Sequence, residues 1–275
     1  MPEWFEGCYM ADDFADLADT PVIKIKWWGS YIENEILEPV TRFLIAFESD
    51  IPAGADLPYS HPGEMLLSQF VHLAGATQLR PGEYSERMIS PGGPPCYEAL
   101  YEYEAVLKNP FPQKPDTVYW LKIVALIDDP IVSVRLRPAV AASGLPLCEF
   151  LNLPYAYQMQ FGLDLPVTRW GWHNRDYTKV DPYASRPPAV VPGEHIQGVL
   201  GDGTQVWHFQ DDAVSGDVII NEATPDMPFV DQPFWMEEFY KYLLPYCDAT
   251  QGVDGPDEIA EFSKDLAFEL WTSDI

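Results

Sequence analysis

Basic residues are scarce in this chain of 275 residues, in which Lys and Arg total 16 and Asp and Glu total 43. The formal net charge of -27 repels phosphate backbones and anionic lipid headgroups, so the composition predicts no nucleic-acid partner. Long apolar runs are lacking as well. The densest stretch, Val118–Ile127, contains Lys122 and is too short to span a bilayer, which takes about 20 residues. We therefore expect no membrane insertion.

Cysteine is also rare, with four residues that form no C-x-x-C pair, so a zinc site is not expected. Two interpretations stay open, namely buried thiols and disulfides, and the second allows three connectivities. Among these, a bond between Cys8 and Cys247 would join the two ends of the chain, which we expect to meet. The four cysteines are Cys8, Cys96, Cys148 and Cys247.

Alternating apolar and polar residues predict many short strands, and scattered Pro and Gly residues leave little room for long helices. Such a pattern is typical of an all-β protein, and we predict an antiparallel β-sandwich of the jelly-roll kind. One domain is expected over residues 1–275, with an N-terminal arm at 1–10 and a short helical or loop-rich insertion at about 225–262. The expected strands are Val22–Trp28, Thr41–Phe47, Glu98–Val106, Thr117–Ile127, Arg169–His173, Gln205–Gln210 and Leu266–Trp271.

Five short sequence motifs follow one another along the chain: ADDF from Ala11, WWGSY from Trp27, HPGE from His61, WGW from Trp170 and DLAF from Asp265. Together they resemble a β-sandwich domain of unknown function found in secreted proteins of planctomycetes and related bacteria. The resemblance implies a β-sheet fold and an extracellular or cell-surface location, although the N-terminal residues of this chain do not form a signal peptide. It implies no catalytic residues.

Aspartates near the two ends of the predicted fold suggest a structural calcium ion. Asp12 and Asp13 precede the first predicted strand, and Asp265 precedes the last. In jelly rolls these strands commonly lie side by side, which would gather the carboxylate oxygens that calcium prefers. The alternative is that these residues cap turns, where Asp is favoured for its own hydrogen bonds.

Tryptophan is abundant, with nine residues, and indole rings are platforms on which sugar rings stack. Trp28 follows Trp27 on a strand, so one of the two should face outward. Trp170 and Trp172 share a face, and the glycine between them leaves space beside their rings. We therefore predict Trp28, Trp170 and Trp172 as polysaccharide contacts. The alternative is that these indoles pack in the core, where Trp is commonly found.

A carboxylate pair for glycoside hydrolysis is a further possibility, because Glu102 and Glu104 would point to one face of a strand, roughly 7 Å apart. The alternative is a solvated strand face opposite Tyr101 and Tyr103. Neither a G-x-S-x-G elbow nor a phosphate-binding glycine loop occurs. Other glutamates considered for such a pair are Glu64, Glu98 and Glu194.

The composition and the motifs together predict a non-catalytic extracellular or cell-surface module that binds polysaccharide. Two alternatives remain open. The first is a structural protein whose copies assemble into an extracellular filament or matrix by strand exchange through residues 1–10. The second is a glycoside-cleaving enzyme. The expected partners are accordingly polysaccharide or further copies of the chain.

Overall fold

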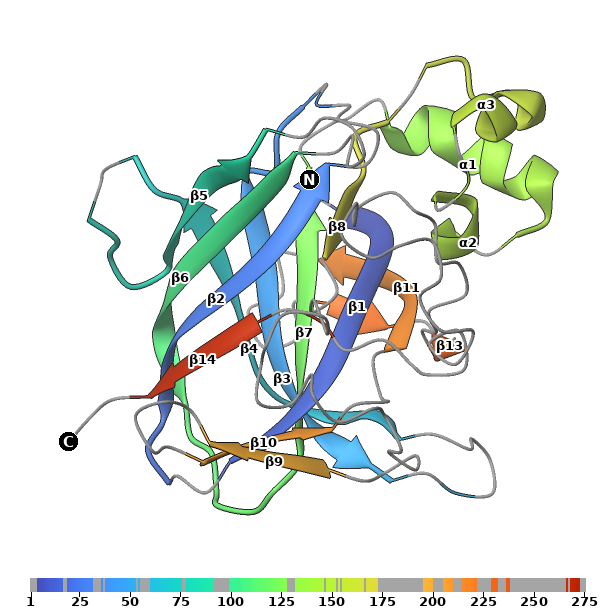
Figure 1. Ribbon diagram of the computed structural model, residues 1–275. Coiled ribbons are helices and arrows are strands. Elements are labelled where there is room, and N and C mark those ends of the chain that lie inside the picture. The colour runs from blue at the N-terminus through green and yellow to red at the C-terminus, as the bar shows by residue number, and fades with distance from the viewer. Residues whose placement is uncertain are drawn as a thin grey trace, which may run out of the picture.

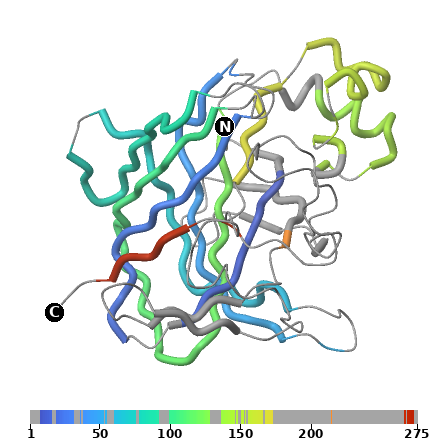
Figure 2. The backbone as a smooth tube through the Cα atoms, in the orientation of Figure 1, coloured from blue at the N-terminus to red at the C-terminus, as the bar shows by residue number. Residues whose placement is uncertain are grey.

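The structure is a computed structural model of the chain. The residues that it describes are 4–16, 19–31, 36, 38–52, 54, 60–75, 78–91, 99–127, 132–145, 147–151, 153, 155–165, 167–172, 195–199, 205–209, 214–221, 229–231, 236–237, 266 and 268–272. Figure 2 traces the backbone, coloured from blue near the N-terminus to red near the C-terminus.

A single sheet of fourteen strands organises the molecule. Its main path runs β12-β11-β1-β7-β3-β4-β5-β6-β2-β14, and it is mixed because β4 and β5 pair in parallel. The strands are β1 (Trp4–Asp16), β2 (Val22–Tyr31), β3 (Arg42–Ile51), β4 (His61–Leu73), β5 (Glu83–Ser90), β6 (Leu100–Phe111), β7 (Tyr119–Leu126), β8 (Trp170–Trp172), β9 (His195–Val199), β10 (Gln205–Phe209), β11 (Val214–Asn221), β12 (Phe229–Asp231), β13 (Met236–Glu237) and β14 (Phe268–Thr272).

This sheet curves through 345° into a nearly closed barrel (Figure 1), so the predicted jelly-roll sandwich is wrong. Alternation along a strand shows which of its faces is buried. It does not show whether that face meets a second sheet or the far side of its own sheet. The individual strands predicted from alternation are nevertheless confirmed, each within a few residues of its observed bounds.

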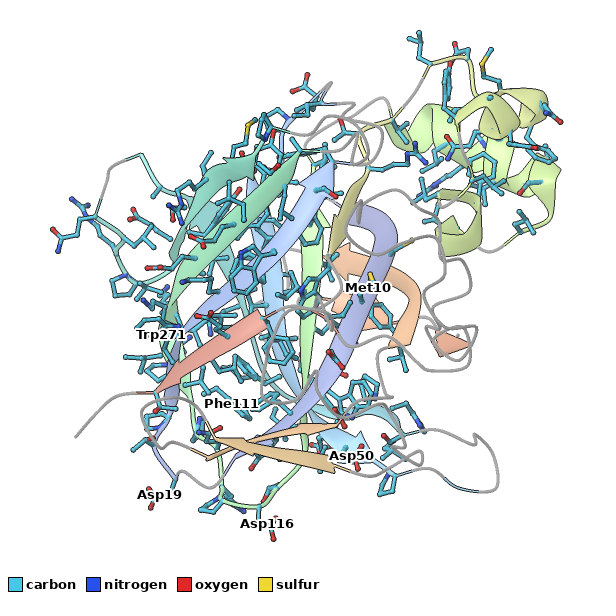
Figure 3. All side chains as sticks on the ribbon, in the orientation of Figure 1. Met10, Asp19, Asp50, Phe111, Asp116 and Trp271 are labelled. Carbon is cyan, nitrogen blue, oxygen red and sulfur yellow. The ribbon has the colours of Figure 1, made fainter. Side chains whose placement is uncertain are left out.

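Aromatic side chains fill the inside of the barrel, as the sticks in Figure 3 show. Trp27 stacks on Tyr103 with ring centroids 5.4 Å apart, and Phe47 stacks on Phe111 at 4.1 Å. Further contacts join strands that are not neighbours, as where Trp27 meets Phe43 edge to face at 5.1 Å. Such offset and edge contacts add stability beyond the burial of apolar area.

A second buried cluster covers the outer face of β1, β7 and β3. It includes Tyr9, Leu44, Trp120 and Val124, which alternate with the inward-facing residues of the same strands. Strand β7 is therefore buried on both faces, as its nearly continuous apolar sequence predicted.

Short helices lie outside the barrel, beside β1 and β11 (Figure 1). They are α1 (Val132–Ser143), α2 (Leu147–Leu151), α3 (Tyr155–Gln158) and the 3-10 turn η2 (Met159–Phe161), which enclose a small core around Phe150. Most of the predicted insertion at 225–262 lies outside the described residues, and Met236–Glu237 within it form β13. In the part of the chain described here, no helix has the length and apolar character needed to span a membrane.

One side chain joins β4 to β6 where no ladder links these strands. The Gln69 amide donates from Nε2 to the carbonyl oxygen of Asn109 at 2.9 Å. Its Oε1 accepts from the backbone N–H groups of Lys108 and Asn109 at 2.8 and 3.0 Å. With only 7% of Gln69 exposed, these three bonds replace a stretch of missing sheet pairing.

We expect Gln69→Leu to lower the free energy of unfolding by about 3 kcal/mol, because it removes three part-buried hydrogen bonds between the Gln69 amide and the backbone of β6. Urea denaturation monitored by tryptophan fluorescence measures the change. Gln78→Leu, at an exposed loop position, is the control and should stay within about 0.5 kcal/mol of the parent. Equal midpoints for the two variants would contradict this role of Gln69.

Candidate functional site

Asp12 lies on the inner face of β1 and is fully buried. Its Oδ1 accepts a hydrogen bond from the N–H of Asp13 at 3.0 Å, and its Oδ2 accepts one from the N–H of Leu266 at 2.6 Å. The carboxylate therefore ties the segment before β14 to β1, across the opening of the barrel. Phe14 and Phe268 meet edge to face along the same opening, with ring centroids 6.4 Å apart.

The three predicted calcium ligands do not all converge. Asp13 follows Asp12 on the strand and so points to the opposite, outer face, where it is 1% exposed opposite Trp120. Asp265 lies outside the described residues. Among the residues described, no three His, Cys, Asp or Glu side chains form a group suited to a metal. The approach of the chain ends is observed at Leu266, and calcium binding stays a prediction.

Two of the three tryptophans predicted to contact polysaccharide face the inside of the barrel. Trp172 is 5% exposed and packs on Phe268 with centroids 5.8 Å apart. Trp170 is half-buried, donates from Nε1 to the hydroxyl of Tyr103 at 2.9 Å, and meets Phe43 edge to face at 5.1 Å. The two indoles share a face, as predicted, but that face is the inner one.

A glycine on β2 makes room for Trp170. A Cβ atom added to Gly29 would overlap the Trp170 ring, with Cε2 at 2.6 Å, and would lie 2.7 Å from the carbonyl oxygen of Gly171. Gly29 pairs with Trp172 in β8 and with Tyr101 in β6, so it lies in the middle of the sheet. The glycine of WWGSY thus accommodates the first tryptophan of WGW.

Tyrosine hydroxyls form a polar group at one end of the barrel. Tyr31 donates to Glu86 Oε2 at 3.1 Å and accepts from the N–H of Val40 at 3.1 Å, while Tyr84 donates to the Val40 carbonyl at 2.8 Å. Burial raises the pKa of Tyr31, Tyr84 and Tyr103 well above the usual range, and Glu86 adds to the effect. The hydroxyls therefore stay protonated and act as donors that anchor the start of β3.

Trp28 and Trp271 lie on the outer face of the barrel. Trp28 is half-buried, and Trp271 is 45% exposed. Lys26 Nζ lies 6.0 Å from the ring centroid of Trp28 and 5.7 Å from that of Trp271, so the two rings are within about 12 Å of each other. Lys24 Nζ lies 3.6 Å above Trp271 and covers one face of that ring.

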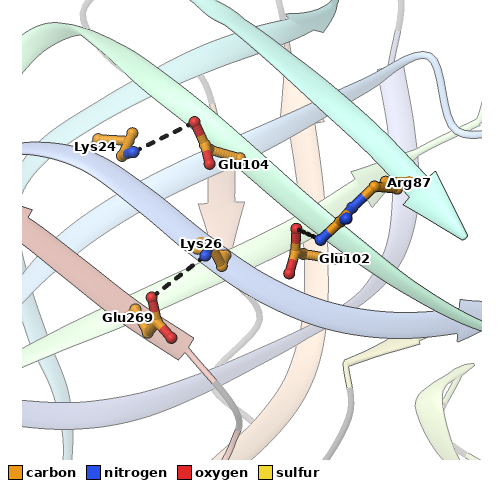
Figure 4. Close-up of polar contacts among 6 residues, drawn as sticks. All are labelled: Lys24, Lys26, Arg87, Glu102, Glu104 and Glu269. Carbon is orange, nitrogen blue, oxygen red and sulfur yellow. Dashed lines mark hydrogen bonds and ion pairs between the residues drawn. The ribbon is translucent and has the colours of Figure 1, made fainter. Parts of the chain in front are cut away.

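Three ion pairs lie on the same outer face as these indoles, and Figure 4 shows the six charged residues that form them. Lys24 pairs with Glu104 at 3.3 Å, Lys26 with Glu269 at 3.6 Å, and Arg87 with Glu102 at 2.7 Å. They come from β5, β6, β2 and β14, four neighbours in the sheet. We call the surface formed by these six residues with Trp28 and Trp271 the Trp28–Trp271 face.

The candidate hydrolytic pair belongs to this face. Glu102 and Glu104 point outward from β6, as their alternation with Tyr101 and Tyr103 predicted, and each is held by a cation from a neighbouring strand. Glu64 is exposed near the start of β4, and Glu98 and Glu194 lie outside the described residues.

Sequence reasoning missed Trp271, although the signal was present. In β14, Phe268 and Leu270 pack against the interior, so Glu269 and Trp271 must point outward. It also missed an ion pair buried outside the barrel, in which Lys122 Nζ lies 2.8 Å from Glu48 Oε1. The single Lys in the apolar sequence of β7 was the visible sign of that pair.

Two further predicted features can now be placed. Cys8 is disulfide-bonded, so of the two interpretations of the cysteines the bonded one holds at this position. Residues 4–10, which belong to the predicted N-terminal arm, lie in β1 and pair with β11 of the same chain.

Comparison with known proteins finds a similarity to one family over part of the chain. No curated protein and no solved structure matches the chain. The model of a domain of unknown function (DUF7901) matches residues 5–137, slightly less than half of the chain. The matched stretch includes nearly all of β1 to β7, which are seven of the fourteen strands, and six of the eight residues of the Trp28–Trp271 face.

Proposed function

We propose that the protein is a non-catalytic module that binds polysaccharide on the Trp28–Trp271 face. The observation that carries the proposal is the indole of Trp271, which is 45% exposed although Lys24 covers one face of its ring. We place the sugar ring on the opposite face of this indole, where its C–H groups can stack. Trp28 supplies a second indole nearby, and the ion-paired side chains around both supply donors and acceptors for hydroxyl groups.

The arrangement of the carboxylates favours binding over hydrolysis. Hydrolysis requires two carboxyl groups that face each other across a bound sugar, with one of them kept protonated. Glu102 and Glu104 instead lie on one strand of the outer surface of a curved sheet, and each forms an ion pair with a cation from a neighbouring strand. Ion pairs of this kind hold the carboxylates in fixed positions, from which they can accept hydrogen bonds from the hydroxyl groups of a sugar.

We also propose an extracellular or cell-surface location. The disulfide at Cys8 supports it, because such bonds persist in oxidising compartments. The resemblance to secreted bacterial domains points the same way. The net charge of -27 suits a protein that must remain soluble outside the cell.

Trp271→Ala tests the binding site. We expect a loss of affinity for polysaccharide on the order of tenfold or more, as for an exposed aromatic residue at the centre of a binding surface. Native gels cast with soluble polysaccharides measure it as reduced retardation of the variant. Trp28→Ala should act in the same direction with a smaller effect, because less of that ring is exposed.

Tyr157→Ala is the matched control. Tyr157 is 56% exposed, but it lies on α3, outside the barrel. Its removal should leave the retardation unchanged. Retardation that persists in both tryptophan variants and disappears in the Tyr157 variant would place the binding surface on the helices instead.

A further inference from the structure

We infer that the ligand of the Trp28–Trp271 face is an uncharged polysaccharide whose chain crosses β2 and β14 and contacts both indoles at once. This inference rests on the proposed function and adds the chemical class of the ligand and its minimum length.

The charges on the Trp28–Trp271 face indicate that its ligand is uncharged. Its three cations, Lys24, Lys26 and Arg87, are each within 3.6 Å of a glutamate carboxylate, so the six charged groups cancel. An acidic polysaccharide would have to displace these glutamates and approach a molecule whose net charge is -27. A neutral chain requires neither, and its hydroxyl groups can hydrogen-bond to paired side chains without separating them.

The partial burial of these pairs explains why they persist beside a ligand. The side chains of Lys24 and Lys26 are about one fifth exposed, at 21% and 19%, and their Nζ atoms lie 3.6 Å from the ring centroid of Trp271 and 6.0 Å from that of Trp28. Their ammonium groups are therefore held in place before any ligand arrives. Preorganised polar groups lose less entropy on binding than freely moving ones.

The positions of the two indoles indicate the minimum length of the polysaccharide. Trp271 is opposite Lys24 in the ladder between β14 and β2. Trp28 lies four residues after Lys24 on β2, so the Cα atoms of Lys24 and Trp28 are about 13 Å apart. A single sugar ring stacks on one indole only, and Lys26 lies between the two. A chain of several sugars is needed to contact both.

A comparison of polymers of different charge tests the class. The full chain is run in native gels that contain a soluble neutral β-glucan, a neutral galactomannan or polygalacturonate, each at low and at high salt. We expect retardation by a neutral polymer, little affected by salt, and none by polygalacturonate. Retardation by polygalacturonate alone, or retardation abolished by salt, would overturn the inference while leaving the proposed function standing. Lack of retardation by every polymer would overturn both.

A comparison of sugars of different length tests whether the ligand contacts both indoles. For the neutral polymer that binds, calorimetry compares its monosaccharide with its hexasaccharide. We expect the hexasaccharide to bind at least tenfold more tightly, and we expect Trp28→Ala and Trp271→Ala each to remove most of that advantage. Equal affinities of the two sugars for the parent protein would overturn the two-indole arrangement. An advantage that survives Trp28→Ala would overturn it as well.

Discussion

Lys122→Met is expected to lower the free energy of unfolding by about 3–5 kcal/mol, because it leaves a buried carboxylate without its counter-ion. Lys122 is fully buried and Glu48 is 1% exposed, with Nζ and Oε1 2.8 Å apart. The ammonium also lies 4.2 Å from the ring centroid of Tyr9, a cation–π contact that the variant would lose. Met matches the Lys stem in shape, so the change removes the charge with little loss of packing.

The surroundings of this pair increase the expected loss. Asp13 lies on the same outer face of the sheet, one diagonal step from Lys122 in the ladder between β1 and β7. One ammonium therefore stands among two buried carboxylates. In Lys122→Met both carboxylates lose this ammonium, so the decrease in the free energy of unfolding should be large at neutral pH. It should shrink as the pH falls, because protonation neutralises the carboxylates that the variant leaves uncompensated.

Urea denaturation at several pH values measures both effects. Lys108→Met, at an exposed position on β6, is the control and should change stability by less than about 0.5 kcal/mol. The double variant Lys122→Met with Glu48→Met should recover much of the loss, because the pair is then replaced by apolar groups of similar volume. A loss below about 1 kcal/mol for Lys122→Met would show that the pair contributes little to the fold.

The strands of the barrel were predictable because their two faces differ in character. On β6, Tyr101 and Tyr103 face the interior while Glu102 and Glu104 face outward, and the sequence shows this as strict alternation. On β1 the same logic failed. Asp12 and Asp13 suggested a turn, yet both are buried within a strand, because Asp12 binds backbone N–H groups and Asp13 lies on the face of the Lys122 pair.

Long-range contacts set the features that the sequence did not predict. The closure of the sheet depends on Gln69 and Asp12, each of which binds backbone groups far away in the chain. Similarly, the abundance of tryptophan did not show which tryptophans lie in the core and which lie on the surface. Trp172 and Trp271 both lie on short strands that pair with β2, and only the direction of each side chain decides that one is buried and the other exposed.

Gly29→Ala is the second change for which we expect a large effect. The added Cβ would overlap the Trp170 ring and approach the Gly171 carbonyl oxygen to 2.7 Å. Either the indole leaves its place against Phe43 and Tyr103, or β8 separates from β2. Overpacking of this kind typically costs about 1–3 kcal/mol, and we expect the upper end because a backbone atom is involved.

Two comparisons make this expectation specific. Gly75→Ala should change stability by less than about 0.5 kcal/mol, because no atom lies within 4 Å of the added Cβ. Combining Gly29→Ala with Trp170→Ala should cost less than the sum of the two single changes, because the ring that obstructs the new methyl group is then absent. Strict additivity in that double-variant cycle would show that the indole is not what requires a glycine here. A coupling of about 1 kcal/mol or more, on the order expected for residues in contact, would show that the Trp170 ring is what requires a glycine at position 29.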